Sequence, residues 1–261
     1  MSTILDVLAA IGRAVLGLCQ QAGSLAIFAG IGLSHIVRPP FYVRLFRQSL
    51  VEFTYFSLPV VALTAVFTGM VLALQSYTGF SRFSAQSAVA SLVVLSVTRE
   101  LGPVLAGLMV AGRIGAAMAA ELGTMRVTDQ IDALSTLSTN PMKYLVAPRL
   151  LAGILSLPIL VAVADILGVA GGWLVGTVKL GFNSGAYLTN TLDFLEPEDV
   201  VVSLVKAAVF GFIVALMGCY HGYRSRGGAE GVGSATTSAV VSASILILAF
   251  DYVLTELFFS K

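Results

Sequence analysis

Charged residues and catalytic motifs are both scarce in this sequence. Asp, Glu, Lys and Arg make up 11% of the 261 residues and hydrophobic residues 57%, whereas a typical soluble domain is about 25% charged. This scarcity excludes an ordinary soluble domain and predicts an all-α integral membrane protein. The net charge of +1 gives no reason to expect nucleic acid as a partner.

Motifs for nucleotide and metal chemistry are missing. The sequence has no G-x-x-x-x-G-K-[ST] loop and no Gly-Lys pair, so the chain cannot hold ATP phosphates in a P-loop. Its two histidines, His35 and His221, lie near the edges of different apolar segments, whereas a metal site or a Ser-His hydrolase needs converging partners. We therefore expect no catalytic residue, no metal and no cofactor in this chain. The two cysteines are interpreted as small packing residues.

What the sequence does contain is long apolar runs. A bilayer core needs about 20 apolar residues per helix, and we predict five transmembrane helices within a single membrane domain that covers residues 1–261. They are expected at residues 53–80, 83–120, 150–178, 200–220 and 232–259.

The position of the N-terminal region, residues 1–48, relative to the membrane is less well defined by the sequence. Residues 14–37 carry no Asp, Glu, Lys or Arg but hold two glutamines and several glycines. This segment could span the membrane or lie in its interface as an amphipathic elbow helix, and we favour the interfacial position.

Orientation is predicted from the short loops, since Lys and Arg gather on the cytoplasmic side. Nine basic residues fall on one side: Arg13, Arg38, Arg44, Arg47, Arg126, Lys143, Arg149, Arg224 and Arg226. Three fall on the other: Arg82, Lys179 and Lys261. The loop at 121–149 is therefore expected in the cytoplasm, and the acidic loop at 179–199 and the C-terminus outside.

A short helix is predicted in the cytoplasmic loop, within residues 124–140. Thr128 can cap its N-terminus, and acidic residues in its first turn suit the helix dipole. Asn140-Pro141 ends it. Its polar face is acidic, whereas membrane-surface helices favour Lys and Arg, so we expect a protein partner in place of lipid. The residues assigned to this coupling contact are Glu121, Met125, Asp129, Gln130, Ile131, Asp132, Leu134 and Leu137. Leu134→Asp is expected to abolish the contact.

Charges at membrane depth form a second candidate set, because ionisable residues there are costly and face the bundle interior or a cavity. Arg99, Glu100, Lys206 and Asp251 are the best candidates for polar residues that pair or rearrange. A purely structural set of interhelical salt bridges is the alternative. Small residues at four-residue spacing, such as Gly168, Gly172 and Gly176, predict close helix packing or a dimer seam.

Two blocks of sequence carry a resemblance. "RELGPVLAGLMVAGRIGAAMAAELGTMRVTDQIDAL" (99–134) and "NPMKYLVAPR" (140–149) resemble the signature of the MlaE family of ABC-transporter permeases, as do "FTGMVLALQSY" (67–77) and "ATTSAVVSASILILAFDYVLT" (235–255). The resemblance extends over nearly the whole chain from about residue 45.

The resemblance implies a multi-pass inner-membrane subunit of a Gram-negative lipid transporter. It implies a homodimer, a cytoplasmic ABC ATPase that binds ATP and Mg, a STAS-domain accessory protein, a periplasmic MCE-domain hexamer, and phospholipid cargo moved to maintain outer-membrane lipid asymmetry. We expect two copies to enclose a lipid pocket whose walls include Leu72, Leu74, Tyr77, Phe80, Phe83 and Leu101. The alternative is an ion-coupled secondary transporter that uses the intramembrane carboxylates, although no inverted repeat supports it.

Overall fold

The computed structural model describes residues 2–83 and 88–259, and within these ranges every regular element is a helix. The elements are α1 (Ser2–Val37), α2 (Val43–Phe80), η1 (Ser81–Phe83), α3 (Val89–Ser96), η3 (Val97–Leu101), α4 (Gly102–Val110), η4 (Ala111–Gly115), α5 (Ala116–Val127), α6 (Gln130–Thr136), η5 (Met142–Val146), α7 (Ala147–Val178), α8 (Ser184–Phe194), α9 (Pro197–Tyr223) and α10 (Gly228–Phe259). Both fold and composition are those of an all-α membrane protein.

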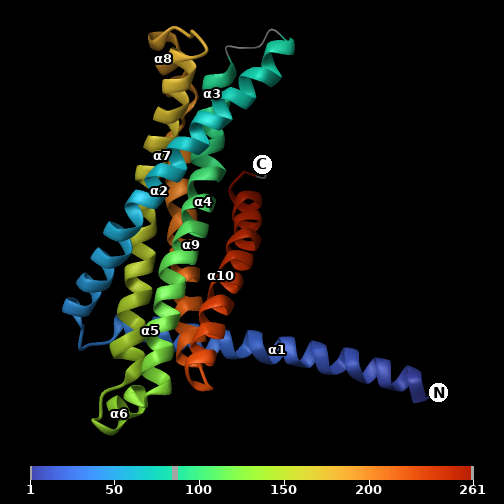
Figure 1. Cartoon of the computed structure of the whole chain (residues 1–261), viewed down its shortest axis with the longest axis vertical. Coiled ribbons are helices and arrows are strands. Elements are labelled where there is room, and N and C mark those ends of the chain that lie inside the picture. Colours follow the sequence, from blue (N-terminus) through green and yellow to red (C-terminus); the bar gives the residue numbers. More distant parts are fainter. Residues whose placement is uncertain (1, 84–87, 260–261) are drawn as a thin grey trace.

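The long helices form an upright bundle with α6 at one end and α8 at the other (Figure 1). Helix α7 packs between α2 and α9, and α10 packs on α9. The run from α3 to α5 crosses this row and contacts all four helices. Buried residues such as Leu122, Leu157 and Phe210 make one continuous apolar core where these helices meet.

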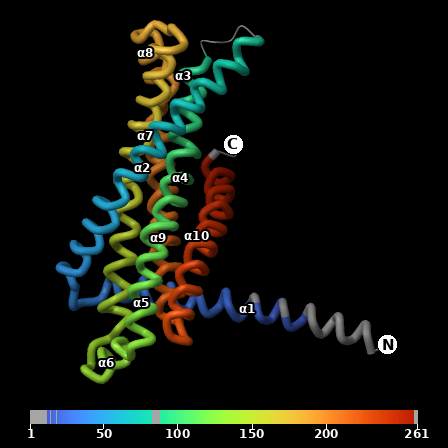
Figure 2. Tube along the Cα trace, viewed as in Figure 1, coloured from blue at the N-terminus to red at the C-terminus, as the bar shows by residue number. Residues whose placement is uncertain are grey.

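Six helical stretches within the described residues are long and apolar enough to cross a membrane, one more than the five spans expected. The additional stretch is Val15–Val37 of α1. Figures 1 and 2 show α1 lying crosswise at the α6 end of the bundle, whereas the other five run along it. If the other five helices cross the membrane, this direction places α1 along the membrane surface, the position expected of an interfacial elbow helix.

Helix α1 is fastened to the bundle by polar and aromatic contacts. The hydroxyls of Ser24 and Tyr220 lie 2.7 Å apart, and Arg224 donates to the Tyr220 hydroxyl at 2.6 Å. Phe28 packs edge-on against Tyr220 with ring centroids 5.5 Å apart. These contacts fix the crosswise direction of α1.

The second span is continuous from Val89 to Val127, with wider π-helical turns at η3 and η4. It therefore begins and ends later than the expected 83–120. The first span begins at Val43, ahead of the expected residue 53, the third at Met142, and the last at Gly228. Charged residues at the helix ends account for most of these differences, because the sequence interpretation stopped a span where the apolar run stopped.

The two connecting segments differ more from expectation. The loop expected at 179–199 contains α8, whose N-cap is Asn183, with its side chain accepting a hydrogen bond from the backbone N–H of Ala186. Burial raises the pKa of Tyr187 on α8 to about 12, so its hydroxyl stays protonated.

The coupling segment expected at 124–140 is divided: residues up to Val127 complete α5, and only Gln130–Thr136 form α6. Its N-cap is Asp129, with φ 58° and no side-chain cap, so the capping role expected of Thr128 was wrong.

The small-residue stripes pack within the chain. A Cβ on Gly69 would lie 1.8 Å from the carbonyl oxygen of Gly168, and one on Gly211 would lie 2.1 Å from that of Gly153. Such distances mean that α2 and α9 touch α7 backbone to backbone. The stripe on α7 thus supports the bundle, and the dimer seam predicted there is not needed to explain it.

Gly69→Ala is expected to lower the stability of the fold by about 1–3 kcal/mol or more, because the added methyl group overpacks the contact between α2 and α7. Gly79→Ala is the matched control, since a Cβ on Gly79 of the same helix meets nothing within 4 Å. Thermal unfolding in detergent checks the pair. Equal midpoints for the two variants would contradict the backbone contact.

Candidate functional site

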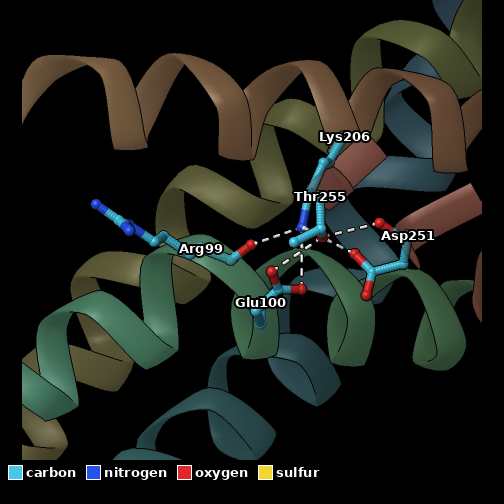
Figure 3. A network of polar contacts seen from close by, with 5 residues as sticks. All are labelled: Arg99, Glu100, Lys206, Asp251 and Thr255. Carbon is cyan, nitrogen blue, oxygen red and sulfur yellow. Dashed lines mark hydrogen bonds and ion pairs between the residues drawn. The ribbon is translucent and has the colours of Figure 1, made fainter. Parts of the chain in front are cut away.

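A buried lysine organises the polar residues at membrane depth (Figure 3). The Nζ of Lys206 on α9 donates to Glu100 Oε2 at 3.0 Å and to Asp251 Oδ1 at 2.9 Å. It also donates to the hydroxyl of Thr255 at 2.8 Å and to the backbone carbonyl of Arg99 at 2.9 Å. An ammonium has three N–H donors, one fewer than these four acceptors, so every N–H is used and at least one is shared between two acceptors. We call Glu100, Lys206, Asp251 and Thr255 the lysine cluster.

The carbonyl of Arg99 is available to Lys206 for a reason visible in the sequence. In an α-helix this carbonyl would accept from the residue four positions later, but that residue is Pro103, which has no N–H. The helix widens here into the π turn η3, in which the N–H of Gly102 donates to the Val97 carbonyl. A proline therefore creates an acceptor inside the bundle, and the lysine occupies it.

Helix α9 presents further polar residues to η3 and to α7. The Nε of Arg99 donates to Asp199 Oδ1 at 2.7 Å, and Asp199 is buried. The hydroxyl of Ser203 donates to Asp165 Oδ2 on α7 at 2.9 Å. Figure 3 shows the Arg99 guanidinium pointing away from the lysine cluster. Asp199, Ser203 and Lys206 thus make a polar stripe along α9, and η3 receives contacts from both ends of it.

Burial within the lysine cluster is uneven. The Lys206 side chain is fully buried, whereas that of Glu100 is 39% exposed and that of Asp251 18%. Both carboxylates therefore open onto the surface beside α10. That helix also exposes large apolar side chains, among them Ile245, Leu248 and Tyr252. A carboxylate at membrane depth faces protein or water and not lipid, so this surface is one that another molecule or a hydrated cavity covers.

The structure brings together part of the lipid pocket predicted from the sequence. Leu72, Tyr77 and Phe80 of α2 pack on a small apolar cluster built around Ala73 and Val93. Leu74 is half-buried and outside that cluster, and the side chain of Phe83 lies outside the described part of the structure.

Leu101 lies elsewhere, in a narrow apolar pocket between α2, α4 and α7. Val97 borders both this pocket and the α2 cluster. The two sites are therefore neighbours along η3, and the pocket at Leu101 is not lined by Leu72, Tyr77 or Phe80.

The residues predicted for coupling divide into two groups. Ile131 is buried and Leu134 is half-buried, and both pack on the chain's own core. Leu137 is 75% exposed. Asp132 accepts from Arg126 at 2.6 Å and Glu121 from Arg149 at 2.7 Å.

The remaining members differ in exposure: Met125 packs partly on the core, while Asp129 and Gln130 are exposed. A partner at this end would therefore meet Leu137 and polar groups. Because Leu134 packs on the core, we now expect Leu134→Asp to disrupt the packing of α6 on its own chain.

Asp199, Ser203 and Thr255 were missed by the sequence interpretation. Asp199 fell in a segment taken as loop, although it completes a capping box with Glu196 ahead of Pro197 at the first turn of α9. Such a box, with proline at the first helical position, is a sequence signal for a helix start. Thr255 lies four residues after Asp251, the spacing of side chains on one helix face.

Gly102→Ala is expected to disrupt this site. A Cβ on Gly102 would lie 1.9 Å from Asp165 Oδ1, so either the carboxylate or η3 must move, at a cost of about 1–3 kcal/mol or more. Gly112→Ala is the control, because a Cβ there meets nothing within 4 Å. The check is the thermal midpoint of each purified variant. A Gly102→Ala protein as stable as the control would show that the contact is unimportant.

Comparison of the sequence with known proteins finds one family and several relatives that match most of the chain. The family described as Permease MlaE matches residues 46–257. A probable ABC transporter permease protein of Rickettsia felis is 59% identical over 256 residues, which cover 98% of this chain and 99% of that protein. The intermembrane phospholipid transport system permease protein MlaE of Haemophilus influenzae is 34% identical, with 98% of each chain covered. The chloroplastic protein trigalactosyldiacylglycerol 1 of Arabidopsis thaliana is 36% identical over 90% of this chain and 67% of its own length.

Proposed function

This chain belongs to the MlaE permease family of ABC transporters, and we propose on that premise that it moves phospholipid between membranes while a separate subunit hydrolyses ATP. The observation that carries the proposal is the lysine cluster, whose carboxylates are partly exposed at membrane depth beside an apolar face of α10. A lipid needs such a combination, with apolar walls for its chains and polar groups for its head.

A second copy of the chain is the proposed cover for this surface. Isologous pairing would place two lysine clusters across one cavity. The apolar face of α10 would then be shared between the copies, and the carboxylates would face water in that cavity and not acyl chains. Homodimerisation thus accounts for both kinds of exposed residue on one helix.

The ATPase is proposed to dock at the α6 end. There, Leu137, Gln130 and Asp132 are exposed, while Ile131 anchors the helix to the core. Force applied to α6 would pass through α5 and η4 to η3, because these form one continuous span. ATP and Mg would bind in the partner and not in this chain.

The remaining parts of the assembly are proposed from the resemblance to the family. We propose an inner membrane location in a Gram-negative bacterium, with the α6 end in the cytoplasm and the C-terminus in the periplasm. A periplasmic MCE-domain hexamer and a STAS-domain protein complete the proposed complex, which would maintain outer-membrane lipid asymmetry. The relatives are named as ABC permeases, which does not favour the ion-coupled alternative.

Purification from native membranes in mild detergent tests the proposal. We expect a P-loop ATPase and an MCE-domain protein to co-purify, with about one or two phospholipids per permease dimer. Mass spectrometry identifies the proteins, and extraction identifies the lipid. A permease that carries neither an ATPase nor a lipid would contradict the proposal.

A further inference from the structure

An apolar groove lies away from the lysine cluster, between α7, α8 and α9, with α3 and η3 as its floor. Its volume is about 580 Å³, within the range of roughly 300–1,000 Å³ typical of small-molecule sites. Ile166 and Leu192, which border it, are each 70% exposed, so the groove opens at the surface. Apart from Thr98, Asp165, Trp173 and Thr191, its lining side chains are purely hydrocarbon.

The groove follows the axis of a membrane span. At 1.5 Å per residue, Trp173 lies about 7 Å from the end of α7 at Val178, and Ala162 about 24 Å from it. The whole span, Met142–Val178, has 37 residues, or about 55 Å at the same rise, so the groove lies in the half of the span away from α6. The medium that surrounds a span at this depth is acyl chain, so the available occupant is lipid.

Trp173 points to a particular part of the lipid. Its Nε1 is buried and has no hydrogen-bond partner among the described residues, although a buried indole N–H usually finds an acceptor. Tryptophan also favours the interfacial level of a membrane, where the ester carbonyls of glycerolipids lie. Because Nε1 has almost no accessible surface, the indole must turn toward the groove for an ester carbonyl to accept from its N–H while the acyl chain extends along Val169 and Ile166.

We propose that this groove binds one phospholipid of the leaflet opposite α6, with an acyl chain in the groove and an ester carbonyl accepting from the indole of Trp173. The inference rests on the proposed function only in taking phospholipid as the natural ligand. It adds a lateral site on the lipid-facing side of the bundle, separate from the surface beside α10.

The groove shares its walls with the polar stripe of α9. Thr98 on its floor precedes Arg99, and Asp165 at its edge accepts a hydrogen bond from Ser203. Val200 and Leu204 line the groove from the helix that carries Asp199 and Lys206. A lipid here therefore contacts η3 and α9, two of the three elements that the lysine cluster joins.

The test uses the fact that Trp173 is the only tryptophan in the chain. Phospholipid with a dibrominated acyl chain is added in steps to the purified permease in detergent, and indole fluorescence is recorded. We expect quenching that saturates at about one lipid per chain. Ala170→Phe, at an exposed position inside the groove, is expected to weaken binding about tenfold. Leu174→Phe, at an exposed position on the next turn outside the groove, should bind like wild type.

A second measurement covers the case in which Ala170→Phe misfolds. Trp173→Phe removes the N–H but keeps an aromatic ring, and native mass spectrometry should show less retained phospholipid than in the wild type. Quenching that rises without saturation, or that is equal in wild type and folded Ala170→Phe, overturns the proposal.

Loss of quenching in the assembled complex would also overturn it, because a partner's transmembrane helix would then be the occupant. ATP-driven lipid transfer by the wild-type complex is measured separately. Transfer without binding in the groove contradicts this inference alone, whereas binding without any transfer contradicts the proposed function alone.

Discussion

Lys206→Met is expected to abolish ATP-driven phospholipid transfer and to lower the free energy of unfolding by about 3–5 kcal/mol, the usual cost of removing one partner from a buried ion pair. Methionine resembles lysine in length but carries no charge. It would leave the carboxylates of Glu100 and Asp251 without their shared cation and the carbonyl of Arg99 without a donor. Transfer from donor to acceptor vesicles and thermal unfolding are the two measurements.

A neutral triple variant separates stability from function. Glu100→Gln, Lys206→Met and Asp251→Asn together remove every charge of the lysine cluster, and replacing a whole buried ionic group is often neutral for stability. We expect this protein to regain most of the lost stability while transfer stays absent. Transfer at the wild-type rate in the triple variant would mean that the cluster only holds the helices together.

Leu137→Asp is expected to reduce co-purification of the ATPase about tenfold or more, a loss of about 1.4 kcal/mol of binding energy, with little change in the stability of the permease. Leu137 is 75% exposed beside α6, so a charge there alters the docking surface and not the core. Val178→Asp is the matched control, because Val178 is 81% exposed at the opposite end of the bundle.

Leu134→Asp provides the contrast within the same helix. Leu134 packs on the core, so this variant should lose folded protein and, as a result, every activity. If Leu137→Asp leaves the amount of bound ATPase unchanged, the docking site is not on this part of α6.

Hydrophobic run length was enough to predict most of the bundle, because lipid leaves a spanning chain few alternatives to a helix. It could not place helix ends. The first span extends back to Val43 through Arg44, Arg47 and Glu52, since charged residues at a span's end can extend to the interface. Helix α8 was missed because it is short and carries polar residues, which resemble a loop when burial is unknown.

Depth and charge singled out Glu100, Lys206 and Asp251, which the structure joins in one cluster. Asp199 escaped notice because its partner Arg99 lies a hundred residues away, and no local pattern links them. For the coupling helix, a local pattern was visible, but the pattern did not show which surface the helix contacts. An apolar stripe has the same period whether it faces a partner or the chain's own core, so Ile131 and Leu134 could not be assigned to the inside without the fold.

ATP-driven transfer by the reconstituted complex is the most direct test of the central claim. The permease and its ATPase are placed in vesicles with fluorescent phospholipid, and transfer to acceptor vesicles is followed with ATP, with a non-hydrolysable analogue, and with a proton ionophore. The account predicts transfer that requires ATP hydrolysis and persists when the ionophore removes the proton gradient. Transfer that proceeds without the ATPase and stops with the ionophore would contradict it and identify an ion-coupled carrier.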